Sequence, residues 1–217
     1  MRQRTVKNLE EKLESNSSYR VMDPRAVKGK WHELFGNDGP IYLEIGCGKG
    51  KFILTRAEQN PSANFIAVEG QENVILRAME KAEAAGLPNL RLFIDFVNDI
   101  GDYFEKGELA GIYLNFSDPW PKARHDKRRL TYHKRLENYF SIMGEDGFVE
   151  FKSDNDGLFE FTLEEIPLVP HLEMVEMTRD LHKSEYESRL VTTEYEDKFH
   201  ESGKNINYVK IKRKSSL

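Results

Sequence analysis

From residue 41 onward, short apolar segments with β-branched residues alternate with segments whose apolar residues recur at helical spacing. This alternation constrains the fold strongly, because parallel strands need long crossover connections, which are usually helices. The expected strands are residues 41–47, 64–70, 90–95, 111–118 and 147–154. The expected helices are residues 51–60, 72–86, 98–106, 131–143 (with Thr131 as a plausible N-cap) and 157–166. The pattern predicts an α/β fold with a doubly wound, mainly parallel sheet.

The two ends of the chain depart from this alternation. Residues 172–181 and 206–214 have strand character, and a short helix closed by Gly203 is expected between them, within residues 192–203. Two closing strands predict an antiparallel hairpin at one edge of the sheet. Residues 1–24 are expected to form a charged arm that is mobile in the absence of a ligand, and residues 25–217 to form one domain.

Composition narrows the class of protein. Apolar residues make up 39% of the 217 residues, which is enough for a core. No stretch approaches the roughly 18 consecutive apolar residues of a membrane helix, and the first residues lack the apolar stretch of a signal peptide. Cys47 is the single cysteine, which excludes an internal disulfide and favours a cytoplasmic location. The six histidines are scattered, so no metal site is expected.

A glycine-rich turn follows the first expected strand. Gly46, Gly48 and Gly50 are spaced G-x-G-x-G, whereas a nicotinamide-binding loop is spaced G-x-G-x-x-G. Glu44 precedes the turn, where it would repel a pyrophosphate and attract an ammonium group. Glu69 ends the next strand, where a carboxylate can accept both ribose hydroxyls. A ligand with an amino-acid end, a ribose and no phosphate fits best, which predicts S-adenosyl-L-methionine.

The adenine contact is expected at the end of the third strand. Asp95 and Asn98 could each accept a hydrogen bond from the exocyclic amine. Phe96 could lie against the ring or offer its backbone amide. The sequence does not choose among these three residues.

Positive charge is concentrated in one window of this acidic chain. The formal net charge is −5, yet residues 122–135 hold seven lysines and arginines and one acid, Asp126. The window therefore contributes +6 and the rest of the chain −11. An acidic body repels nucleic acid in general, while one basic patch would hold it in one pose. A solvated helix face is the weaker interpretation, because opposite charges are not interleaved at helical spacing.

Asp118 ends the fourth expected strand, directly before this window. The carboxyl ends of parallel strands are where ligands bind, so Asp118 should face the cofactor cleft. Pro119 and Pro121 stiffen the backbone, and Trp120 between them offers a flat apolar surface or a core contact. A carboxylate beside a stacking surface and a cationic segment suits an extruded base of a nucleic acid.

Guanine is a base that suits this combination of a carboxylate, a stacking surface and a cationic segment. An aspartate can accept hydrogen bonds from both N1–H and N2–H₂, and the N7 lone pair on the opposite edge attacks a methyl group without deprotonation. Such an enzyme needs alignment rather than a general base. The carboxylate would also stabilise the positive charge that develops on the ring.

The chain resembles the bacterial tRNA (guanine-N7-)-methyltransferases from about residue 40 to its end. The resemblance rests on the segments "YLEIGCGKGKF", "FIAVEG", "YLNFSDPWPKARHDKRRLT", "FKSDNDGLFEF", "DLH" and "TEYEDKF". It implies a Rossmann-like class I fold, S-adenosyl-L-methionine as cofactor, and methyl transfer to N7 of a guanosine in the variable loop of tRNA.

The resemblance also implies roles for individual residues. Glu44 and Glu69 match cofactor ligands, and Asp118 matches the central catalytic carboxylate. Substrate contacts are implied for Lys122, Arg124, His125, Lys127, Arg128, Arg129, Asp154, Thr193, Glu194, Tyr195 and Glu196. Phe96 departs from the family, in which an aspartate is frequent near this position, so the adenine contact stays open.

Two other readings compete with this one. Methyltransferases that act on exocyclic amines use an acid or Asn followed by Pro-Pro-aromatic at the same strand end, but here the aromatic residue lies between the prolines. A non-catalytic RNA-binding protein with a decayed cofactor fold would not need Glu44, Glu69 and Asp118. The chain could act as a monomer or a homodimer.

Overall fold

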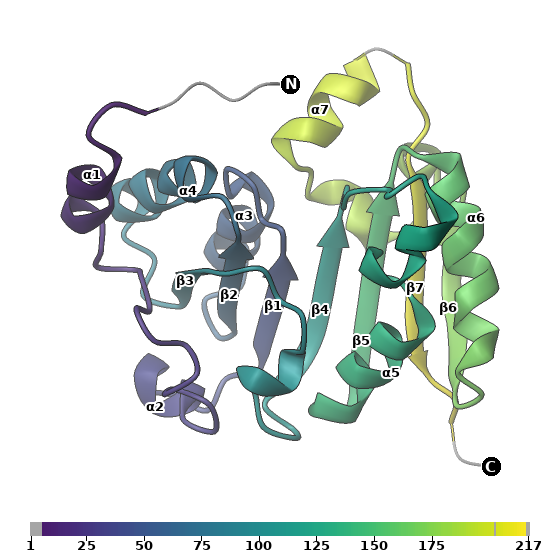
Figure 1. Ribbon diagram of the computed structural model, residues 1–217, viewed down its shortest axis with the longest axis horizontal. Coiled ribbons are helices and arrows are strands. Elements are labelled where there is room, and N and C mark those ends of the chain that lie inside the picture. Colours follow the sequence, from purple (N-terminus) through teal and green to yellow (C-terminus); the bar gives the residue numbers. More distant parts are fainter. Residues whose placement is uncertain (1–5, 202, 216–217) are drawn as a thin grey trace.

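A twisted seven-stranded sheet forms the centre of the computed structural model, which describes residues 6–201 and 203–215 (Figure 1). The strand order is β3-β2-β1-β4-β5-β7-β6. The strands are β1 Ile41–Ile45, β2 Asn64–Glu69, β3 Leu90–Ile94, β4 Leu109–Asn115, β5 Met143–Ser153, β6 Leu172–Thr178 and β7 Asn207–Arg213. The first five pair in parallel, which confirms the doubly wound α/β prediction.

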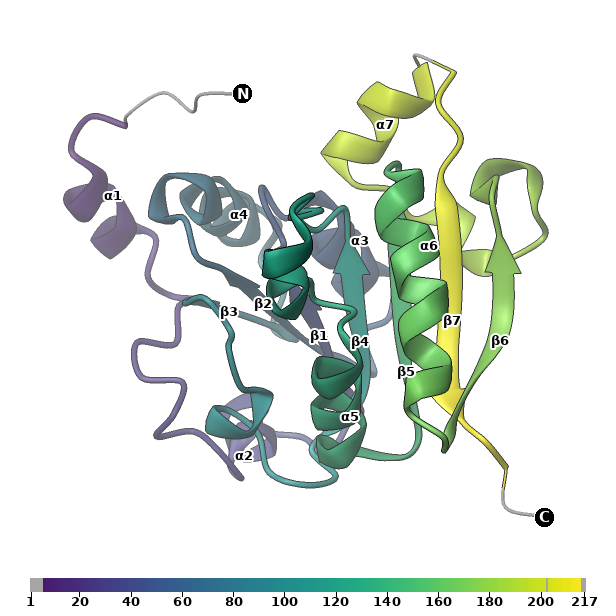
Figure 2. The same cartoon turned by 45° about the vertical axis from the view of Figure 1, so that its right-hand side comes forward.

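Helices cover both faces of this sheet (Figure 2). Successive residues of a strand point to opposite faces: Leu43 and Ile66 enter one apolar core, and Phe65 and Ala67 enter the other. The first core is shared with α2 Trp31–Phe35, α5 His133–Ile142 and α6 Asp156–Glu165. The second is shared with α1 Leu9–Ser15, α3 Lys51–Gln59 and α4 Glu72–Ala85. Burial on both faces explains why the parallel strands read as continuous apolar runs.

The predicted C-terminal antiparallel pair is confirmed, with β7 lying inside the sheet. β7 pairs antiparallel with both β5 and β6, so β6 is the edge strand. Between β6 and β7 lie two short 3₁₀ turns, Leu181–Lys183 and Glu187–Leu190, followed by α7 Glu194–Glu201. This connection carries α7 to the carboxyl ends of β4 and β5 (Figure 1).

Several predicted boundaries are wrong. The helix expected at residues 98–106 is only a 3₁₀ turn, Ile100–Asp102. β4 ends at Asn115, because Phe116 has a left-handed φ of 54° that breaks the strand before Asp118. Thr131 is not an N-cap: α5 starts at His133, and the buried Thr131 hydroxyl lies 2.7 Å from the Thr162 hydroxyl.

The N-terminal segment packs against the domain. The Leu13 side chain of α1 is buried against α4, and the Val21 N–H donates to the Leu92 carbonyl at 2.8 Å beside β3. Its mobility in solution stays a prediction, and residues 1–5 lie outside the described part of the chain. Within residues 6–201 and 203–215, no helix has both the length and the apolar character to cross a membrane.

Candidate active site

The predicted functional residues gather at the carboxyl ends of the parallel strands. Glu44 lies near the end of β1 and the glycine turn follows it, Glu69 ends β2, the Asp118 loop follows β4, and Asp154 follows β5. α7 lies at the same end of the sheet (Figures 1 and 2). The topology thus brings together segments more than 140 residues apart in sequence, as the parallel-sheet prediction required.

Glu44 is a buried carboxylate with one oxygen unused. The residue is 1% exposed, and its Oε1 accepts a hydrogen bond from Asn115 Nδ2 at 2.7 Å. Its Oε2 has no hydrogen-bond partner among the described residues. Desolvation raises the pKa of Glu44 to about 8, although the Asn115 hydrogen bond acts in the opposite direction. A buried carboxylate of this kind gains most from a cationic partner.

The glycine turn leaves space beside Glu44. Gly46 and Gly48 have φ of 81° and 57°, and a Cβ at either position would meet no atom within 4 Å. Gly50 serves packing instead, because a Cβ there would lie 2.7 Å from Ala78 Cβ. The Gly48 N–H donates to Glu69 Oε2 at 3.2 Å, so the turn and the end of β2 are joined. A second backbone donor, Gln71 N–H, holds Glu69 Oε1 at 3.0 Å.

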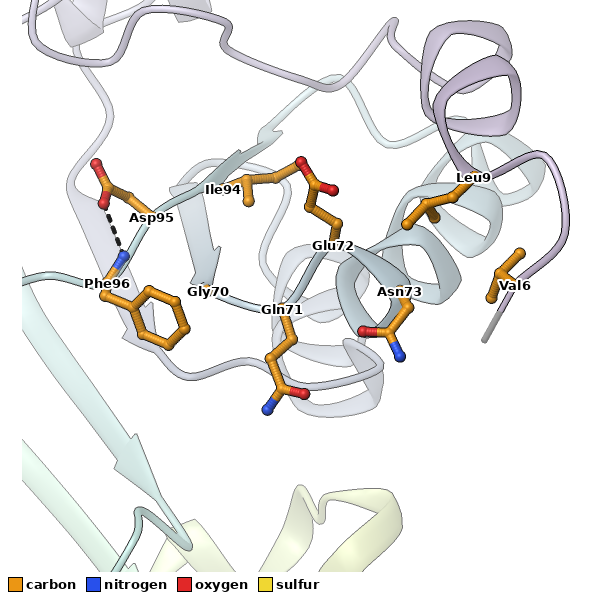
Figure 3. A pocket seen from close by; sticks show the side chains of 9 residues that line it. All are labelled: Val6, Leu9, Gly70, Gln71, Glu72, Asn73, Ile94, Asp95 and Phe96. Atoms are coloured by element: carbon orange, nitrogen blue, oxygen red, sulfur yellow. Dashed lines mark hydrogen bonds between the residues drawn. The ribbon is translucent and has the colours of Figure 1, made fainter. Parts of the chain in front are cut away.

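The three candidates for the adenine contact differ in their surroundings, and the side chains of two of them, Asp95 and Phe96, point in different directions (Figure 3). Asp95 is engaged by the Tyr103 hydroxyl at 2.8 Å and by Arg25 Nη2 at 3.2 Å. Phe96 is 67% exposed and lines a pocket beside Gly70 and Gln71, where its ring fills the space that a Gly70 Cβ would need. Asn98 is exposed, and its carbonyl accepts from Arg135 Nη1 at 3.3 Å. Asp95 lines the same pocket, but its carboxylate is already engaged, so the geometry favours the exposed Phe96 ring as the contact surface.

Asp118 lies in a loop whose backbone is held by hydrogen bonds from Arg129. The side chain of Asp118 is exposed, two residues after the left-handed Phe116. Arg129 donates to the carbonyls of Pro119 at 3.1 Å and Trp120 at 3.0 Å. Arg129 also pairs with Asp126 at 2.9 Å, and its side chain is only 12% exposed. Arg129 therefore holds the loop in shape, and the RNA contact that the family resemblance implies for it stays a prediction.

Most other cations of the basic window are exposed, whereas Arg135 donates to the carbonyls of Lys127, Val97 and Asn98. A 3₁₀ turn at Ala123–Arg128 presents four exposed cations, which are Lys122, Arg124, Lys127 and Arg128. His125 in this turn is half-buried. The Arg128 guanidinium lies 4.8 Å from the centroid of the Trp120 ring. A half-buried indole covered by an exposed guanidinium is a surface on which a base can stack.

The four residues of the "TEYE" segment, Thr193–Glu196, have two different surroundings. Thr193 and Glu196 are buried, whereas Glu194 and Tyr195 lie toward the site. Thr193 Oγ1 accepts from the Glu196 N–H at 2.9 Å, and Glu196 Oε2 accepts from the Thr193 N–H at 3.4 Å. This reciprocal arrangement is a capping box that starts α7, and both residues are buried. Tyr195 faces the site, with its hydroxyl 3.4 Å from Asp154 Oδ2 and its ring 5.1 Å from the Phe116 ring. Glu194 pairs with Lys81 and accepts from the Lys51 N–H at 3.4 Å.

Two residues of this region were missed by sequence reasoning. Asn115 sets the orientation of Glu44, and Lys152, 1% exposed on β5, bonds to the segment that leads into α7. Both interrupt otherwise apolar strands, in "YLNFSD" and "GFVEFKSD". A polar residue inside a strand that should be buried was the available signal.

Comparison with known proteins identifies the class. A family model described as "Putative methyltransferase" matches residues 38–209. The 16S rRNA methyltransferase KamB has a similar crystal structure, with a TM-score of 0.66 at 13% identity, covering 86% of this chain and 94% of that one. TrmN from Thermus thermophilus gives a TM-score of 0.58 at 15% identity, covering 95% of this chain and 48% of that one. Fold and site define a Rossmann-like class I methyltransferase.

Full-length relatives identify the family. The tRNA (guanine-N(7)-)-methyltransferase of Clostridioides difficile (strain 630) is 48% identical over 216 residues, which cover 99% of this chain and 100% of that protein. The protein of the same name from Streptococcus pneumoniae (strain Hungary19A-6) is 45% identical over 206 residues, covering 95% and 97%. The chain belongs to the tRNA (guanine-N(7)-)-methyltransferase family. Family and fold imply use of S-adenosylmethionine.

Proposed function

We propose that the chain methylates N7 of a guanosine in the variable loop of tRNA, with S-adenosylmethionine as the methyl donor. The observation that carries this proposal is that two carboxylates with different surroundings, Glu44 and Asp118, lie at the same end of the sheet. Glu44 is buried with an unused oxygen beside an open glycine turn, and Asp118 is exposed beside Trp120 and the basic window. The first suits a small cationic ligand and the second suits an RNA base.

The residues around Glu44 fit S-adenosylmethionine. Glu44 Oε2 would accept from the ammonium group, and the space beside Gly46 and Gly48 admits a ligand close to the backbone. Glu69 would accept from the ribose hydroxyls and Phe96 would lie at the adenine end. When bound, the cofactor supplies an electrophilic methyl group on a sulfonium. In the part of the chain that the structure describes, no three His, Cys, Asp or Glu side chains gather as they would around a metal ion.

Asp118 would orient the base. Its carboxylate can accept from N1–H and N2–H₂ of guanine, which leaves N7 on the opposite edge free to attack. N7 carries no proton, so Asp118 acts as an acceptor and as a counter-charge for the ring, not as a base. Trp120 would support the stacked base, and Tyr195 and Asp154 would border it from α7 and β5. Holding the reactants in line is the main catalytic contribution available here.

The base that is methylated tests this proposal. We expect nucleoside analysis of a tRNA transcript, treated with the protein and labelled S-adenosylmethionine, to yield 7-methylguanosine. Label on an exocyclic amine of adenine or cytosine would favour the competing class of methyltransferase. A protein that binds tRNA and S-adenosylmethionine but transfers no label would overturn the proposal.

Glu69→Ala should weaken S-adenosylmethionine binding by about 10- to 100-fold, because a carboxylate that accepts two hydroxyls is lost. The affinity for tRNA should stay within about twofold, since Glu69 lies away from the basic window and surface changes of this kind act locally. Calorimetry for the cofactor and filter binding for tRNA measure the two constants. A variant that lost tRNA affinity and kept cofactor affinity would contradict the ribose assignment.

Arg128→Gln should reduce the salt dependence of tRNA binding by about one in the slope of log K against log salt, as expected for one lost phosphate contact. Arg129→Gln is the matched comparison, because its guanidinium is already committed to Asp126 and to two carbonyls. Arg129→Gln should leave this slope unchanged and lower the melting temperature instead. Equal slopes for Arg128→Gln and the wild type would make the basic window a solvated surface only.

A further inference from the structure

A single buried ammonium group connects the core sheet to the segment before α7. Lys152 is 1% exposed on β5, and its Nζ donates to the Ser188 carbonyl at 2.7 Å and to the Val191 carbonyl at 2.8 Å. The third contact of Nζ is Glu196 Oε2 at 3.3 Å. An ammonium group has three donors, and all three of Lys152 are used.

Glu196 extends this connection into the first turn of α7. Its side chain is 0% exposed, and its Oε1 lies 3.1 Å from His182 Nε2. Its Oε2 also accepts from the Thr193 N–H in the capping box. The cluster of buried Lys152 and Glu196 with half-buried His182 therefore helps to fix where α7 begins.

α7 in turn carries the side chains that border the proposed base site. Tyr195 contacts Phe116 and Asp154, and Phe116 lies two residues before Asp118. Glu194 reaches toward the glycine turn, where the N–H of Lys51 donates to it at the start of α3. α7 thus bridges the glycine turn and the Asp118 loop, and its placement decides the width of the site between them.

We propose that Lys152 is a positioning residue for methyl transfer. It lies too deep to touch RNA, and it acts by holding residues 188–196 so that Tyr195 and Glu194 face Asp118 across the base. This inference rests on the proposed function, because it places guanine between Asp118 and α7. Loss of the ammonium should release the segment before α7 while the parallel sheet stays intact.

Lys152→Met tests this inference, with Lys210→Met as the matched control. Lys210 also forms ion pairs from a neighbouring strand, with Glu150 at 3.1 Å and Glu176 at 3.9 Å, and neither partner belongs to the 188–196 segment. At saturating S-adenosylmethionine, kcat/KM for tRNA should fall at least about tenfold in Lys152→Met, as expected when hydrogen bonds to a charged group are lost. Lys210→Met should stay within about twofold of wild type.

Amide hydrogen exchange supplies a second measurement that does not depend on activity. Exchange at residues 188–197 should quicken at least about tenfold in Lys152→Met and stay at the wild-type rate in Lys210→Met. Unchanged exchange there, or an equal loss of kcat/KM in both variants, would overturn the inference. If Lys152→Met does not fold, Lys152→Gln, whose amide can still reach one carbonyl, serves in the same comparison. A wild-type protein without guanine-N7 activity would refute the proposed function, while the exchange comparison would still report on Lys152.

Discussion

Replacing Asp118 with alanine should lower kcat for tRNA methylation by at least about 100-fold, which is typical of removing one charge-stabilising group. The carboxylate is exposed beside Trp120, where it can accept from the pairing edge of guanine. Without it, the base loses both its alignment and the counter-charge for the positive ring. The affinity for S-adenosylmethionine should change less than about threefold, because Glu44 and Glu69 remain and separated sites act nearly independently.

The matched control for this experiment is Asp146→Asn. Asp146 is another exposed acid, located in the first part of β5 before its buried residues. Its replacement should leave kcat and both affinities unchanged. Steady-state methylation of a tRNA transcript at saturating substrates measures kcat, and near-normal turnover of Asp118→Ala would remove Asp118 from the mechanism.

Replacing Glu44 with glutamine should weaken S-adenosylmethionine binding and stabilise the ligand-free protein. Glutamine keeps an oxygen that accepts from Asn115 but loses the charge that attracts an ammonium group. The expected loss of affinity is about 10- to 100-fold, the range for a hydrogen bond between charged groups. Isothermal calorimetry measures it, and Glu58→Gln, an exposed acid on α3, is the control.

The stability effect of Glu44→Gln depends on pH in a defined direction. Desolvation raises the pKa of Glu44 from 4.5 to about 8 in the folded, ligand-free protein. Between these two values the folded state retains a proton that the unfolded state has released. The free energy of unfolding therefore falls with rising pH, by about 1.4 kcal/mol per pH unit from this group. Glu44→Gln should remove this slope, so its melting temperature should exceed that of the wild type most clearly near pH 8.

If the melting temperatures of the wild type and of Glu44→Gln changed with pH in the same way, the buried placement of Glu44 would be contradicted. Equal cofactor affinities would contradict its role as the ammonium ligand. Opposite signs for binding and stability are the expected result, because functional sites often retain charges that cost stability.

The sequence predicted the fold well, because the fold depends on strong local patterns, and the location proposed for the site follows from that fold. Continuous apolar strands separated by helical spacing require a parallel sheet, and a parallel sheet places Glu44, Glu69 and Asp118 at one edge. The two antiparallel strands near the C-terminus could also be predicted from local sequence. The position of β7 between β5 and β6 could not be predicted. Strand order depends on which edge of the sheet is left uncovered and not on local spacing.

The orientation of individual side chains could not be predicted from the sequence. Arg129 and Arg128 are adjacent in a basic run, yet Arg129 points inward to two carbonyls and Arg128 covers Trp120. Glu196 and Glu194 lie two residues apart in a short acidic helix, yet only Glu196 is fully buried. These differences depend on partners distant in sequence, such as Lys152 for Glu196, and a single sequence does not reveal such pairs.

In the proposed reaction, Asp118 holds the N1–H and N2–H₂ edge of guanine while N7 receives the methyl group. Inosine lacks only the N2 amine, so a tRNA transcript with inosine at the target position tests this contact directly. Wild-type protein should methylate the guanosine transcript about 10- to 100-fold faster than the inosine transcript. Asp118→Ala should show little preference between the two. An equal preference in both proteins would mean that another group reads the guanine edge, and the assignment of Asp118 would be wrong.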